Sequence, residues 1–147
     1  MGLSISHNTF RAPYSTFMEW RRWIALQVGI PLDLMEGFYH EGELSMFTLL
    51  DHKFPQEDAI EMRQIRRFKK MLPLKWSAFK PSPLHELLYH SDCDGYINYS
   101  SAREIAKSLK SVLDNTKGKD EWMEKITQQF IDGCNRAAKE KQKLQFR

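Results

Sequence analysis

Apolar residues recur at helical spacing along several stretches of the chain, and polar, glycine-containing or proline-containing segments separate these stretches. From about Ser15 to Val28 the apolar positions follow an i, i+3, i+4 pattern, and Thr16 with Glu19 has the spacing of an N-terminal capping box. The same period returns from about Gln56 to Met71. Each pattern predicts an amphipathic helix with one buried face.

The last third of the chain carries the strongest helical pattern. Ser101 and Glu104 have capping-box spacing, and the apolar stripe that follows them predicts a helix ending near Asn115. After Asp120 a longer helix is predicted. Its apolar stripe consists of Trp122, Ile126, Phe130, Gly133, Cys134 and Ala137.

Shorter elements complete the predicted fold. Ser82 as N-cap and Pro83 at the first helical position predict a short helix from Leu84, and residues 3–10 and 144–146 are expected to be extended. The sequence therefore predicts a mainly α fold. We expect all 147 residues to form a single compact domain of five or six helices, with a short two-stranded element near the termini.

Composition places the chain among globular proteins, with 41% hydrophobic and 28% charged residues. No apolar run approaches the roughly 20 residues that span a bilayer, and the first residues lack the pattern of a secretion signal, so we expect a cytoplasmic protein with no membrane partner. The two cysteines, Cys93 and Cys134, form no Cys-x-x-Cys pair. This excludes a zinc ribbon or a redox dithiol and predicts reduced thiols.

The net charge of +3 is unevenly distributed, because residues 63–85 contain no carboxylate. The cations of this segment, interleaved with aromatic residues, have the character of a phosphate-binding surface and make nucleic acid a candidate partner. They also fit the solvated face of an amphipathic helix. The basic surface residues are Arg63, Arg66, Arg67, Lys69, Lys70 and Lys75.

The segment from His90 to Asn98 concentrates potential metal ligands around a glycine. It resembles the EF-hand calcium loop, in which oxygen ligands stand at positions 1, 3, 5, 7 and 12 and glycine stands at position 6. With Gly95 at position 6, Asp92 and Asp94 take positions 3 and 5.

The two ends of the loop depart from that pattern. Position 1 is His90, and position 12 is Ser101 instead of a glutamate, with Glu104 further along the chain. The predicted start of the next helix at Ser101 is also later than the exiting helix of an EF-hand. A cation site on this resemblance would use His90, Asp92, Asp94, Tyr96 through its carbonyl, and Glu104.

Three further interpretations apply to the same segment. His-x-Asp-x-Asp-Gly, matched by His90, Asp92, Asp94 and Gly95, resembles the first motif of the DHH phosphoesterases, which implies bound manganese and hydrolysis of a phosphoester. The chain lacks that family's further motifs. Alternatively, the aspartates and the glycine form an ordinary turn between helices. Residues 84–109 also resemble a group of small bacterial and phage proteins with no known activity, which implies a bacterial or phage context.

The sequence favours a small binding or regulatory protein over an enzyme, and no catalytic residue is assigned. We expect a protein partner. The alternatives are a hydrolase or an EF-hand-like module that uses Ca²⁺ or Mn²⁺ at the His90 segment, and a nucleic-acid binder that uses residues 63–80. They differ in geometry, because a hydrolase needs its ligands to converge on an open cleft, whereas a turn bonds its side chains to its own backbone.

Overall fold

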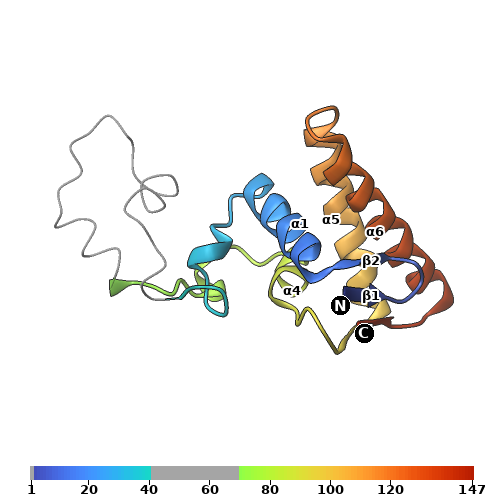
Figure 1. The fold of residues 1–147 in the computed structure, drawn as a ribbon, viewed down its shortest axis with the longest axis horizontal. Helices are drawn as coiled ribbons and strands as arrows, with labels where there is room; N and C mark the ends of the chain where they lie inside the picture. The colour runs from blue at the N-terminus through green and yellow to red at the C-terminus, as the bar shows by residue number, and fades with distance from the viewer. Residues whose placement is uncertain (1, 41–69) are drawn as a thin grey trace. The chain divides into compact units, whose positions relative to one another are not determined.

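The computed structural model describes residues 2–40 and 70–147, which are mainly helical as predicted. They divide into two units. One unit comprises residues 2–30 and 81–147, and the other comprises the described part of 31–80. The α-helices given for the described residues are α1 (Tyr14–Gln27), α4 (Leu84–Tyr89), α5 (Tyr99–Thr116) and α6 (Glu121–Glu140), shown in Figure 1.

Helix α1 forms where the apolar period predicts it, but its start differs from the prediction. The helix follows Pro13, whose fixed φ suits a helix entrance, and no side chain caps it, so the capping box of Thr16 and Glu19 is not formed. Trp20 is fully buried, as its position in the stripe predicts, whereas Val28 is exposed. Val28 lies beyond the last helical residue, where the stripe no longer faces the core.

Helices α5 and α6 pack side by side as an antiparallel pair (Figure 1). Asp120 caps α6 by accepting a hydrogen bond from the backbone N–H of Met123 at 3.1 Å. The capping box predicted at Ser101 is wrong, because α5 already begins at Tyr99. Trp122 is also 52% exposed instead of buried, because the first turn of α6 projects beyond the core.

A cluster of aromatic rings joins α1 to α6. The ring centroids of Trp20 and Phe130 are 4.7 Å apart, and Phe17 lies 6.0 Å from Trp20. The Trp20 indole N–H donates to the Thr127 hydroxyl at 2.9 Å, so the polar atom of this buried ring is satisfied. These rings form the centre of the core.

Two small antiparallel sheets hold the chain ends. Strands β1 (Gly2–Ile5) and β2 (Phe10–Pro13) form a hairpin, and β3 (Tyr96–Ile97) pairs with β4 (Leu144–Gln145). A bridge between Ile5 and Phe146 links the two sheets, so the C-terminal residues lie between β1 and β3. The prediction of an extended segment is confirmed for Leu144 and Gln145, and at the other end it holds only for residues 3–5 and 10, because residues 6–9 form the turn between β1 and β2.

The second unit is described in two pieces, which a short parallel bridge between Met35 and Leu74 holds together. Each piece contains one 3-10 turn, at Leu32–Leu34 and at Trp76–Ala78. The helix predicted from Gln56 to Met71 lies almost wholly outside the described residues. Among the helices of residues 2–40 and 70–147, none is both long enough and apolar enough to cross a membrane.

Candidate functional site

The His90 segment connects α4 to α5 and is anchored by apolar residues on both sides. Leu84, Leu87 and Leu88 bury one face of α4, and Ile97 in β3 is fully buried. The short helix begins as the sequence indicates, except that Pro83 is the N-cap while the Ser82 hydroxyl accepts from the Leu84 N–H at 3.2 Å. The loop between these anchors is therefore held at both ends.

The His90 imidazole bonds to the backbone of its own loop. Its Nε2 lies 3.0 Å from the carbonyl oxygen of Tyr96, and its Nδ1 lies 2.8 Å from the carbonyl oxygen of Ser91. The ring stacks on Phe146, with centroids 4.0 Å apart and planes inclined by 28°.

The side chains of Ser91 and Asp94, which follow His90, also bond within the loop. The Ser91 hydroxyl donates to the Asp94 carboxylate at 2.7 Å and accepts from the Cys93 N–H at 3.3 Å. Gly95 has a φ of +87°, which a glycine adopts without strain. Its carbonyl oxygen accepts from the backbone N–H of Phe146 at 2.9 Å. This is the bonding pattern of a structured turn.

Arg21 holds the C-terminal end of α4, a role that none of the sequence motifs predicts. Its guanidinium is buried and donates to the carbonyl oxygens of Leu88 at 3.1 Å and His90 at 2.7 Å. Burial lowers the pKa of Arg21 to about 10, although the negative charge of Asp92 acts in the opposite direction. The available signal was its position one helical turn after Phe17, on the buried stripe of α1.

Of the residues predicted to bind a cation, Asp92 is half-buried and its negative charge acts on Arg21, while the others form bonds in two different places. His90, the Tyr96 carbonyl and Asp94 take part in the loop bonds just described, while Glu104 lies on α5 and pairs with Lys107 at 3.2 Å. Within residues 2–40 and 70–147 no three His, Cys, Asp or Glu side chains are grouped so that they could hold a metal ion. The Ca²⁺ or Mn²⁺ site stays a prediction.

The predicted basic surface falls largely outside the described residues. Arg63, Arg66, Arg67 and Lys69 belong to the segment that is not described, while Lys70 and Lys75 are exposed. Nucleic-acid binding by residues 63–80 therefore also stays a prediction. Of the two thiols, Cys134 is buried in α6, as its place on the apolar stripe predicts, and Cys93 is exposed in the loop.

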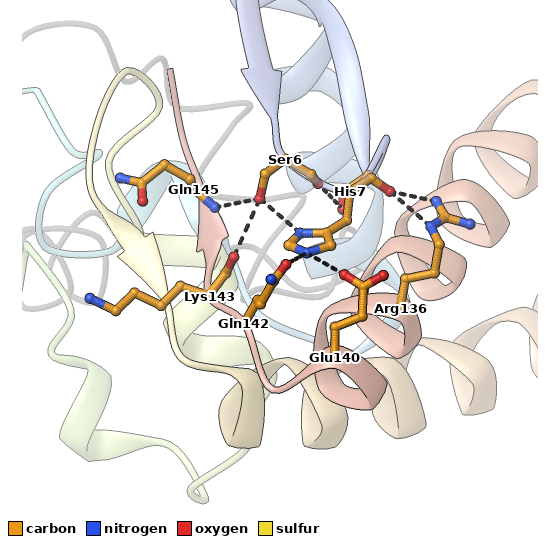
Figure 2. Close-up of polar contacts among 8 residues, drawn as sticks. Ser6, His7, Arg136, Glu140, Gln142, Lys143 and Gln145 are labelled. Carbon is orange, nitrogen blue, oxygen red and sulfur yellow. Dashed lines mark hydrogen bonds and ion pairs between the residues drawn. The ribbon is translucent and has the colours of Figure 1, made fainter.

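A second polar cluster, not indicated by the sequence, ties the β1–β2 turn to the C-terminal residues (Figure 2). The Ser6 hydroxyl lies 3.0 Å from Nδ1 of His7, and Nε2 of His7 lies 3.2 Å from the Glu140 carboxylate. Hydrolases with a catalytic triad hold a hydroxyl, an imidazole and a carboxylate in the same order. Ser6 and His7 are adjacent in sequence and Glu140 is remote, so no sequence spacing could have revealed the cluster.

The bonds of the Ser6 oxygen indicate that this cluster has a structural role. The oxygen accepts from the backbone N–H of Gln145 at 2.8 Å and lies 3.4 Å from the carbonyl oxygen of Lys143, in addition to its contact with His7. A hydroxyl has one proton and two lone pairs, so these contacts use most of its bonding capacity. The carbonyl of His7 in turn accepts two bonds from Arg136, at 2.6 and 3.0 Å.

Comparisons with models of protein families, with curated proteins and with solved structures found no match to this chain.

Proposed function

We propose that the protein is a small binding protein that presents the His90 loop and its flanking tyrosines to a protein partner. One observation carries this proposal: the side chains of His90, Ser91 and Asp94 bond within the loop, while the tyrosines in the loop and beside it are exposed. Tyr89, Tyr96 and Tyr99 are 52%, 49% and 37% exposed. Exposed tyrosines on a rigid support are enriched at protein interfaces, because they bury a large area and lose little conformational entropy.

The chemistry around Tyr96 supports the same role. The ammonium group of Lys143 lies 4.1 Å from the centroid of the Tyr96 ring, so the aromatic face is presented together with a positive charge. A partner with an acidic or polar surface would suit this pair. By contrast, a hydrolase would require His90, Asp92 and Asp94 to converge on an open cleft, and His90 and Asp94 bond within the loop instead.

The proposal is tested by replacing exposed aromatic residues with alanine, either at the loop or at a separate place on α6. Wild-type protein is crosslinked in bacterial extract, and the captured protein is then purified and titrated against the variants by calorimetry. We expect Tyr96→Ala/Tyr99→Ala to weaken binding by roughly 30-fold or more, as for interface hot spots. Trp122→Ala, which removes an exposed ring on α6, is expected to bind like the wild type.

Two results would count against this function. Equal binding by all of these proteins would remove the tyrosines from the interface. Manganese-dependent hydrolysis of a phosphodiester that disappears in Asp92→Ala/Asp94→Ala would instead assign the loop to catalysis.

A further inference from the structure

The loop and its flanking helices follow the order of elements of an EF-hand, even though the ends of the loop differ from one in sequence. Helix α4 ends at Tyr89, a short strand follows at Tyr96–Ile97, and α5 begins at Tyr99. The start at Tyr99, earlier than the predicted Ser101, brings the exiting helix closer to the EF-hand pattern. Position 6 holds Gly95 at a φ of +87°, as the sharp turn of an EF-hand loop requires.

The imidazole of His90 fills the inside of this loop. Its Nε2 reaches the carbonyl oxygen of Tyr96 at 3.0 Å, and its Cε1 lies 3.3 Å from the place that a Cβ on Gly95 would occupy. In a calcium-bound EF-hand the side chain at position 1 and the carbonyl at position 7 both bind the ion, which therefore lies between them. His90 and Tyr96 are those two positions, and here the ring itself connects them.

We propose that the His90 imidazole takes the structural role that the calcium ion has in an EF-hand, so that this helix–loop–helix is held closed without metal. The ring satisfies the carbonyl that an ion would bind. Phe146 stacks on the ring at 4.0 Å and keeps it in place. This inference is independent of the proposed function, since it concerns what holds the loop and not what the loop binds.

The sequence makes the inference reversible by two substitutions. Asp92, Asp94 and Gly95 already occupy positions 3, 5 and 6 of the loop. Exchange of His90 for aspartate and of Ser101 for glutamate would complete the pattern Asp-x-Asp-x-Asp-Gly-x₅-Glu. If the backbone is that of an EF-hand, the double variant must bind calcium in place of the ring.

The experiment measures thermal melting by circular dichroism in calcium and in EDTA, together with terbium luminescence sensitised by Tyr96. We expect the wild type to melt at the same temperature in both solutions and to give no sensitised emission. His90→Asp/Ser101→Glu should melt lower than the wild type in EDTA, gain at least about 5 °C in calcium, and sensitise terbium. The matched control His90→Asp/Ser100→Glu carries the same charges with the glutamate one residue out of place, and it should gain little.

Each alternative result overturns the proposal. A wild type that is stabilised by calcium or manganese would show that an ion binds although the ring is present. An unchanged melting temperature of His90→Asp in EDTA would show that the ring does not hold the loop. A double variant that neither recovers in calcium nor sensitises terbium, including one that stays unfolded, would show that the loop is not of the EF-hand type.

Discussion

Gly133, in the middle of α6, is required because the β1–β2 hairpin lies directly on the helix backbone. A Cβ at position 133 would come 2.6 Å from the Cα of Thr9, a distance that only a shift of the backbone could relieve. Gly133→Ala should therefore destabilise the protein by about 2–4 kcal/mol, although alanine favours helix by about 1 kcal/mol over glycine. Urea denaturation measures the change.

Two further variants separate this clash from helix propensity. Asn135→Ala, at an exposed position of the same helix, should change the free energy of unfolding by less than about 0.5 kcal/mol. Adding Thr9→Ala to Gly133→Ala should not restore stability, because the Thr9 backbone is part of the obstacle. Full restoration would show that only the Thr9 side chain stands in the way.

Arg21 illustrates a buried charge that is held by backbone carbonyls. Arg21→Leu removes the donors to Leu88 and His90 and leaves both carbonyl oxygens without them, so we expect a loss of about 2–4 kcal/mol by chemical denaturation. Arg21→Lys should lose less, since an ammonium keeps the charge but lacks the planar fork. Arg103→Leu, at an exposed position of α5, is the control, and an equal loss there would contradict the role of Arg21.

Cys134 is expected to make the free energy of unfolding depend on pH in the alkaline range. Burial raises the pKa of its thiol from 9.0 to about 12. Between these values the native protein holds a proton that the unfolded chain releases, so the free energy of unfolding falls as the pH rises above about 9. Urea denaturation at several pH values should show this slope, of up to about 1.4 kcal/mol per pH unit, in Cys93→Ala but not in Cys134→Ala.

At the scale of elements, the helices and the extended chain ends followed from local pattern, whereas the pairing of the strands did not. Helix α6 has its apolar stripe and its Asp120 cap within one continuous segment, so the sequence alone locates it. The start of α5 depends on β3, whose pairing with Leu144 and Gln145 keeps Tyr96 and Ile97 extended. No local spacing contains that partner, and the capping-box signal at Ser101 therefore misled.

The same reasoning explains what was predictable about the site. The glycine turn and the buried Ile97 were visible in the loop sequence, because turn chemistry is local. The stacking of His90 on Phe146 and the bonds from Arg21 come from distant segments, and only the tertiary fold brings them together.

Strand β4 and the residue after it are expected to stabilise the whole first unit. Phe146 is 2% exposed and packs on His90 and on Phe17, so Phe146→Ala should lose about 3–5 kcal/mol of the free energy of unfolding. Gln145→Ala keeps the backbone bonds of the strand and should lose less than about 1 kcal/mol. Similar losses from both variants would contradict the special contribution of the Phe146 ring.

At the scale of the whole molecule, the placement of residues 144–147 between β1 and β3 makes folding depend on both ends of the chain. The bond from Gln145 to Ser6 joins residues 139 positions apart. Contacts at such separation form slowly, because a large loop must close before they contribute. During synthesis the β1–β2 hairpin is made before residues 144–147, so the edge of β1 that they cover is open to pairing with other strands until they arrive.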